Sequence, residues 1–145
     1  MIILPAQILL GGEAEGPLTR WSAPLSFWGG YDAVAGRVID RTHPAFGETI
    51  AGAILAMPSG RGSGSASSVL AEAIRLGNAP AAILLGASDP IIGIGAIVAA
   101  RLYGTVCPVA VCEIGELGTI QAGARVRIVA RDGEVEIVLA PQEAV

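Results

Sequence analysis

Apolar runs alternate with helical patterns through the middle of the chain. Three short runs contain almost no polar residues, which is typical of strands buried on both faces: residues 52–57, 81–85 and 106–112. Between these runs, apolar positions recur with helical spacing at 69–76 and 91–103, and Gly77-Asn78 is a stop signal for the first helix. The order strand, helix, strand, helix, strand predicts right-handed crossovers and one parallel layer of three strands.

The two ends of the chain carry strand patterns of a different kind. Residues 124–130 and 134–139 alternate apolar and polar positions around Asp132-Gly133, which is a strong signal for a β-hairpin. The apolar start contains Pro5, which argues against a central strand because proline cannot donate to a sheet ladder. The tail, 140–145, is expected to be loose. Shorter elements are expected at 16–23 (strand), 36–41 (strand) and 113–120 (short helix or loop).

A segment rich in glycine and serine, residues 58–68, links the first buried strand to the first helix. In a parallel layer this loop lies at the carboxyl edge of the sheet, with the loops at 86–90 and 113–118, where ligands usually bind. It aims backbone N–H groups, with those of Gly64 to Ser67 as the candidates, and the positive end of the helix dipole at one point, which favours an anion. Two interpretations stay open: a serine-capped helix after a tight turn, or an anion or oxyanion site with a working serine.

Two familiar active-site motifs do not fit this loop. A P-loop requires a lysine for the phosphates, and this segment has none. A nucleophile elbow, G-x-S-x-G, is excluded by the spacing of Gly62-Ser63-Gly64-Ser65. The chain has one histidine, His43, which is the only histidine that could act as a base for a catalytic serine. We keep it as a candidate for that role, although a lone histidine is more often structural. The aromatic segment 24–32 is either a packed cluster under a long loop or a rim that faces a ligand or partner.

The amino-acid composition indicates that part of the surface of this chain is covered by a partner. Only 15% of the residues are charged and 52% are hydrophobic, whereas about 25% charged is typical of soluble domains. We therefore expect a large apolar face that a partner covers, although alanine and glycine at the surface are an alternative. The length of 145 residues predicts one domain, 1–145.

Several other classes of function are disfavoured by the sequence. The net charge is −4 and no stripe of basic and aromatic residues occurs, which argues against nucleic acid. No apolar run reaches the ~18–20 residues that span a bilayer, and the start lacks the features of a signal peptide, so a cytoplasmic location is expected. Cys107 and Cys112 are expected in a buried strand, and no metal site is predicted in this chain.

A set of short motifs occurs in one order along nearly the whole chain. The motifs are Ala14-Glu-Gly16, Pro24-Leu-Ser-Phe-Trp-Gly-Gly30, Gly36-Arg-Val-Ile-Asp-Arg41 with His43-Pro44, Pro58-Ser-Gly-Arg-Gly-Ser63, and Asp89-Pro90 before an apolar run. Together they resemble the small, swivelling-domain subunit of the aconitase X family. The resemblance implies an α/β fold, the β/β/α swivelling domain of aconitase-like type, with a central parallel layer and a C-terminal hairpin.

The same resemblance implies a partner and a catalytic residue. The partner would be a much larger subunit that carries an iron–sulfur cluster and most of the substrate pocket. In aconitase-like swivelling domains the serine of the Gly-x-Gly-Ser turn acts as the catalytic base, and Ser63 matches that place. Arg61, Gly62, Gly64 and Ser65 are then the expected substrate-binding residues. The aconitase pattern continues Ser-Ser-Arg, whereas no arginine follows Ser63, so charge must come from Arg61 or from the partner.

The resulting expectation is the small subunit of a hydro-lyase that is active only with its large subunit. The family includes bacterial cis-3-hydroxy-L-proline dehydratases and archaeal mevalonate 5-phosphate dehydratases. We favour dehydration of cis-3-hydroxy-L-proline to 1-pyrroline-2-carboxylate, because Arg61 is the only basic residue in the loop and a phosphate usually recruits more charge. A mevalonate 5-phosphate dehydratase subunit and a non-catalytic docking module are the alternatives.

Overall fold

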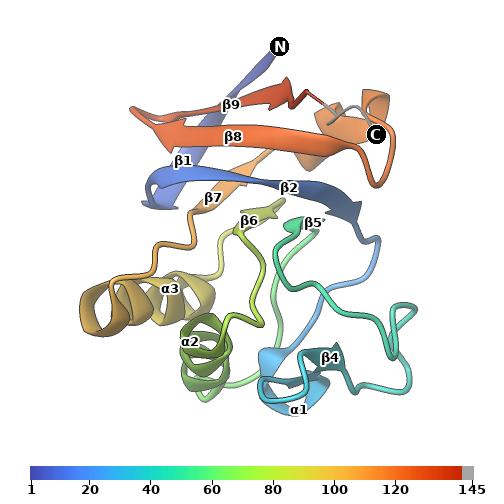
Figure 1. The fold of residues 1–145 in the computed structure, drawn as a ribbon, viewed down its shortest axis with the longest axis vertical. Coiled ribbons are helices and arrows are strands. Elements are labelled where there is room, and N and C mark those ends of the chain that lie inside the picture. Colours follow the sequence, from blue (N-terminus) through green and yellow to red (C-terminus); the bar gives the residue numbers. More distant parts are fainter. Residues whose placement is uncertain (142–145) are drawn as a thin grey trace.

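The computed structural model describes residues 1–141 of the chain, and seven of its strands close into a barrel (Figure 1). The strands follow one another around the barrel in the order β1-β7-β6-β5-β2-β8-β9, and β9 pairs with β1. Their bounds are β1 (Ile2–Leu10), β2 (Gly12–Arg20), β5 (Ile54–Met57), β6 (Ala82–Leu85), β7 (Val109–Cys112), β8 (Arg125–Arg131) and β9 (Glu134–Leu139). The sequence therefore predicted the mixed α/β class correctly.

The predicted parallel layer is confirmed and contains one strand more than expected. β5 pairs in parallel with β6, and β6 with β7. β2 adds a fourth parallel strand, because Leu18–Arg20 lies beside Ile54–Ala56. The predicted strand at 16–23 is wrong at both ends, since β2 starts at Gly12 where it pairs with β8.

Two helices cover one face of the parallel layer, and the β8–β9 hairpin lies on the opposite side of the barrel (Figure 1). The helices are α2 (Ala66–Leu76) and α3 (Pro90–Tyr103). Along β5, Ile54 and Ala56 belong to the core inside the barrel, whereas Leu55 and Met57 belong to the core under the helices. Both faces of the strand are thus buried, which explains why the run has no polar positions.

Several local predictions are settled by the structure. The hairpin is confirmed, with φ of 53° at Asp132 and 73° at Gly133, as the tightest hairpin turns require. The prediction from Pro5 is wrong: β1 is a strand of the barrel wall with a neighbour on each side, and Pro5 sits where its partner changes from β9 to β7. Ala140 is buried and donates its N–H to the Arg125 carbonyl (2.9 Å), so it is not loose. Residues 142–145 of that tail lie outside the described part.

A long excursion between β2 and β5 packs beside α2. It contains α1 (Phe27–Gly30), β3 (Tyr31–Asp32) and β4 (Arg37–Val38), and β4 is shorter than the strand predicted at 36–41. The Tyr31 hydroxyl donates to the Asn78 carbonyl (2.6 Å) and thereby ties the excursion to the end of α2. The segment predicted as a short helix or loop after β7 is a 3₁₀ helix, η1 (Ile114–Thr119).

Two glycines let the β5–α2 loop lie flat against its neighbours. A Cβ on Gly60 would lie 2.2 Å from Asp89 Oδ2 and 2.5 Å from Ile92 Cδ1. A Cβ on Gly62, where φ is +107°, would lie 2.3 Å from Ser26 Oγ. The loop is also joined to the excursion, because the Arg61 N–H donates to the Leu25 carbonyl (3.3 Å). The position of the loop therefore depends on the absence of these two side chains.

Gly60→Ala tests this packing. We expect the free energy of unfolding to fall by about 1–3 kcal/mol, because the new methyl group overlaps the Asp89 carboxylate. That carboxylate cannot easily move, since its Oδ1 accepts the Ile91 N–H at the start of α3 (3.0 Å). Urea unfolding measures the change. The double variant Gly60→Ala with Asp89→Ser should recover much of the lost unfolding free energy, because serine still caps the helix but lacks the second carboxylate oxygen.

The matched control is Gly64→Ala, whose Cβ would meet no atom within 4 Å. It should change the stability by less than about 0.5 kcal/mol. Equal effects of the two alanines would contradict the packing account.

Candidate functional site

The carboxyl ends of the parallel strands bring the predicted loops together. The Ala87 N–H donates to the Pro58 carbonyl (2.9 Å), and a Cβ on Gly86 would lie 3.0 Å from that carbonyl and 3.5 Å from Ile114 Cδ1. The loops after β5, β6 and β7 therefore meet at one edge, as the sequence predicted. The end of β2 joins them, because the Trp21 N–H donates to the Ala56 carbonyl (2.9 Å).

Ser63 lies exposed at the leading end of α2. Its side chain has no hydrogen bond within the described part of the chain, and its carbonyl accepts the Ala66 N–H (3.0 Å). The hydroxyl is thus available to a molecule that approaches this edge. The position of Ser63 follows from the preceding loop, which Gly60 and Gly62 hold against other segments.

Only part of the predicted set of amide donors is available at this end of α2. We expected the N–H groups of residues 64–67 to face a ligand, but those of Ala66 and Ser67 already donate to the carbonyls of Ser63 and Gly64 (3.0 and 3.2 Å). The prediction is wrong for these two, because the chain closes a tight turn before the helix. The amides of Gly64 and Ser65 make no such bond among residues 1–141.

The remaining loop residues that the sequence selected lie next to Ser63 and are exposed. Ser65 occupies the N-cap position of α2 without a side-chain cap bond, so its hydroxyl is not used by the helix. The Ser67 hydroxyl donates to the Gly64 carbonyl (2.8 Å) and is therefore structural. Arg61 projects from the same loop, and its positive charge interacts with the Asp40 carboxylate. Hydrogen bonds from Thr42 hold the pKa of Asp40 below its ordinary value, and His43 and Arg61 lower it further.

Three polar residues around the loop were not identified from the sequence as parts of a site. Ser26, whose hydroxyl donates to the Trp28 carbonyl (2.9 Å), lies against Gly62. Asp89 caps α3 and lies against Gly60. Asp40 lies near Arg61. Only Asp89 had a local signal, because an aspartate followed by proline is a common way to begin a helix; the other two depend on contacts between distant segments.

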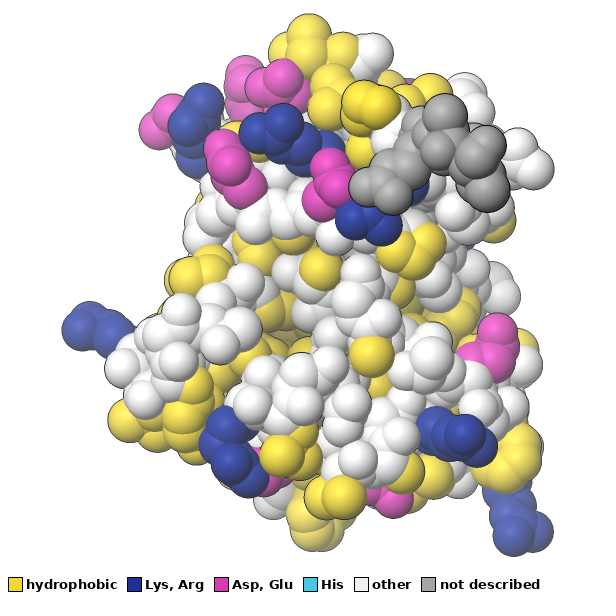
Figure 2. Space-filling view, in the orientation of Figure 1, with side chains coloured by type: hydrophobic (Ala, Val, Ile, Leu, Met, Phe, Trp, Pro, Cys, Tyr) yellow, Lys and Arg dark blue, Asp and Glu magenta, His cyan; other side chains and the backbone are white. Residues whose placement is uncertain are grey.

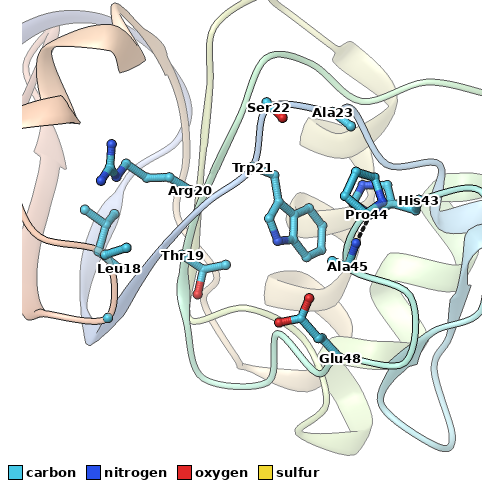
Figure 3. A pocket seen from close by; sticks show the side chains of 12 residues that line it. Leu18, Thr19, Arg20, Trp21, Ser22, Ala23, His43, Pro44, Ala45 and Glu48 are labelled. Atoms are coloured by element: carbon cyan, nitrogen blue, oxygen red, sulfur yellow. Dashed lines mark hydrogen bonds between the residues drawn. The ribbon is translucent and has the colours of Figure 1, made fainter.

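Two adjoining pockets flank the indole of Trp21. One, of about 360 Å³, has its walls in the end of β2, the turn after β4 and the segment just before β8, and includes Trp21, His43 and Glu48 (Figure 3). The other, of about 400 Å³, lies over Ala56 and Ile114 at the carboxyl edge. Ser63 lines neither pocket. Sequence patterns could not reveal them, because the neighbours of β2 were unknown.

The residues of this chain do not fit an iron–sulfur cluster. Such clusters are held mainly by cysteine thiolates, usually four. Burial raises the pKa of the Cys107 thiol to about 12, and burial together with the Glu113 charge raises that of Cys112 to about 11. Residues 1–141 contain no group of three or more His, Cys, Asp or Glu side chains placed to hold a metal ion.

Charged side chains gather over the β8–β9 hairpin and are fewer around the helices and loops below it (Figure 2). The hairpin region includes the exposed ion pair of Arg125 with Glu15 (2.9 Å). The predicted site therefore lies away from the most charged part of the surface. None of the helices in the described part has the length and apolar character that a membrane span would need.

Comparison with known proteins gives three findings. The family model of the aconitase X swivel domain matches residues 3–137. The cis-3-hydroxy-L-proline dehydratase of Pseudomonas aeruginosa is 50% identical over 109 residues, which cover 75% of this chain but only 19% of that protein. The phosphomevalonate dehydratase small subunit of Thermococcus gammatolerans is 39% identical over 129 residues, which cover 89% of this chain and 92% of the subunit.

A solved structure agrees with both the fold and the family. The crystal structure of Thermococcus kodakaraensis aconitase X in its holo-form contains a chain that is 34% identical, with a TM-score of 0.80 and coverage of 95% of this chain and 99% of that one. The resemblance that the loop motifs suggested is thereby confirmed. This chain belongs to the aconitase X swivel-domain family.

Proposed function

We propose that this chain is the small subunit of a dehydratase and supplies the catalytic base, Ser63, to a site that a large subunit completes. The observation that carries the proposal is the exposed hydroxyl of Ser63 at the start of α2, on a loop fixed by Gly60 and Gly62. Membership of the aconitase X family supports the reaction class. An exposed hydroxyl with no protein partner is suited to a pocket that closes only on assembly.

The proposed chemistry is the elimination of water from a hydroxy acid. Ser63 removes the proton from the carbon next to the substrate carboxylate, and the hydroxyl group on the neighbouring carbon leaves as water after protonation. A serine is a poor base unless its alkoxide is stabilised. The free amides of Gly64 and Ser65 and the positive end of α2 favour the alkoxide, and donors of this kind contribute ~3–4 kcal/mol each when they are aimed at an oxyanion.

The other residues of the loop bind and orient the substrate. Arg61 supplies the positive charge of this loop, and its guanidinium suits a planar carboxylate. The Ser65 hydroxyl is free to donate to the same group, and Gly62 and Gly64 let the substrate approach the backbone.

We place the iron–sulfur cluster in the large subunit. We place the complex in the cytoplasm, where free thiols such as Cys107 stay reduced.

The relatives give two indications about the substrate. Sequence identity favours cis-3-hydroxy-L-proline, because the dehydratase of that name is 50% identical over its matched part. Chain organisation favours a phosphorylated mevalonate, because the small subunits that match nearly end to end carry that name. We favour cis-3-hydroxy-L-proline, since Arg61 is the only cation in the loop and a phosphate usually binds several. The elimination gives an enamine with a double bond between the two reacting carbons, and a proton shift from nitrogen to carbon then gives the final product, 1-pyrroline-2-carboxylate.

Ser63→Ala tests the role of the base. In the complex reconstituted with the large subunit, we expect kcat to fall by about 10²–10⁴-fold, the usual contribution of a positioned base. The complex should still assemble, because the Ser63 side chain makes no bond within the chain. Ser68→Ala, an exposed serine on the first turn of α2, is the matched control and should keep wild-type turnover. Normal turnover by Ser63→Ala would rule out this base.

A substrate assay tests the choice of hydroxy acid. The reconstituted complex is offered cis-3-hydroxy-L-proline and mevalonate 5-phosphate separately, and water elimination is followed by NMR. We expect turnover of the hydroxyproline alone, since one guanidinium matches one carboxylate. Turnover of mevalonate 5-phosphate alone would reverse the substrate assignment, and no turnover of either would favour a non-catalytic docking module.

A further inference from the structure

His43 carries a buried hydrogen-bond donor that has no acceptor among the described residues. The side chain is 6% exposed, and its ring meets the indole of Trp21 edge to face, with 4.7 Å between ring centroids. Nδ1 accepts the Ala45 N–H at 3.0 Å, so this nitrogen carries no proton (Figure 3). The proton of the neutral ring is therefore on Nε2. Within residues 1–141, Nε2 has no hydrogen-bond partner.

An unpaired buried donor is uncommon and unfavourable in folded proteins. His43 forms part of the wall of the pocket of about 360 Å³ beside Trp21. Other walls of the pocket carry side-chain oxygens, on Thr19, Ser22 and Glu48, but none of them is a hydrogen-bond partner of Nε2 (Figure 3). Nε2 is itself closed off from solvent. An acceptor that a second molecule supplies through this pocket therefore reaches Nε2 only after a movement of the surrounding side chains.

Exposed apolar and aromatic side chains lie on the same excursion as His43. Phe46, which is 52% exposed, lies on the turn that carries His43, and Ile39, which is 46% exposed, lies between β4 and that turn. Trp28, at 59%, lies on the neighbouring turn of the same excursion. A buried polar anchor ringed by exposed apolar and aromatic side chains is typical of an interface hot spot. We call Trp28, Ile39, His43, Phe46 and the pocket beside Trp21 the His43 face.

We propose that the His43 face docks the large subunit, which inserts a carbonyl oxygen into the pocket and accepts the Nε2–H of His43. The inference rests on the proposed function, because it takes the large subunit as the partner. A neutral carbonyl is favoured over a carboxylate, since the Glu48 carboxylate points into the same pocket and would repel a second negative charge (Figure 3). Arg20 also lines the pocket, with its side chain directed away from Trp21 (Figure 3).

The identity of the occupant follows from the connection between this face and the catalytic loop. Asp40 lies between the two, close enough to both His43 and Arg61 for each to lower its pKa, after the larger effect of Thr42. Ser26 joins Trp28 to Gly62. A subunit that closes over Ser63 and a bound substrate therefore reaches the His43 face. In the longer P. aeruginosa protein, the matched part is only 19% of the chain, so the remaining residues are available to cover the same surface.

A pair of substitutions separates the two nitrogens of His43. His43→Asn places an amide oxygen where Nδ1 lies, so it keeps the acceptor for Ala45 but removes the outer donor. His43→Gln reaches the place of Nε2 with an amide N–H. We expect His43→Asn to weaken association with the large subunit by about 10- to 100-fold, and His43→Gln to recover much of that loss. Equal affinities for the two variants would overturn the proposal.

A matched pair of apolar residues tests which face docks. Phe46 on the His43 face and Ile94 on α3 are almost equally exposed, at 52% and 51%. Helix α3 and the segment that follows β4 lie on different sides of the molecule (Figure 1). Phe46→Ser should weaken association, whereas Ile94→Ser should not. A larger effect of Ile94→Ser would show that α3 is the interface and would overturn the proposal.

The wild-type chain allows a test without substitution, because it contains only one histidine. With ¹⁵N-histidine, the Nε2–H signal should move downfield and exchange more slowly with solvent when the large subunit is added. An unchanged signal in the complex would overturn the proposal.

If His43→Asn binds normally while Ser63→Ala is inactive, only the docking inference fails. If His43→Asn binds weakly while Ser63→Ala is active, only the catalytic proposal fails.

Discussion

Two missing Cβ atoms determine where the β5–α2 loop of this chain can lie. At Gly60 the backbone touches the carboxylate that caps α3, and at Gly62 it touches the hydroxyl of Ser26. Any side chain at these positions would overlap those groups, so the loop would have to lift away. Because Ser63 follows directly, its place at the start of α2 depends on the same two contacts. The Gly-x-Gly part of the motif is therefore required for packing, independently of the role that we propose for Ser63.

The barrel provides the frame on which that loop is mounted. Four parallel strands end at one edge, and their loops are joined there by backbone hydrogen bonds such as Ala87 to Pro58. Strands buried on both faces are stiff supports, so the positions of their ends vary little. The helices cover one face and the charged hairpin closes the other, which leaves this edge as the place where a partner can approach.

The sequence predicted those features that depend on local patterns. Asp132-Gly133 predicted the hairpin, and the unbroken apolar runs predicted the buried parallel strands. Local sequence patterns did not predict how distant segments pair. The partner change of β1 at Pro5 was predicted wrongly, and the contact of Ser26 with Gly62 was not foreseen. The amides of Ala66 and Ser67 were counted as free because a sequence does not show which carbonyls turn back toward them.

The proposed mechanism requires Ser63 to reach the carbon of the bound hydroxy acid that loses its proton. A crystal structure of the complete complex with substrate or product bound measures this distance most directly. We expect Ser63 Oγ within about 3–3.5 Å of that carbon, with the N–H groups of Gly64 and Ser65 directed at Oγ. A structure with a side chain of the large subunit in that place, and Ser63 turned away from the substrate, would contradict it.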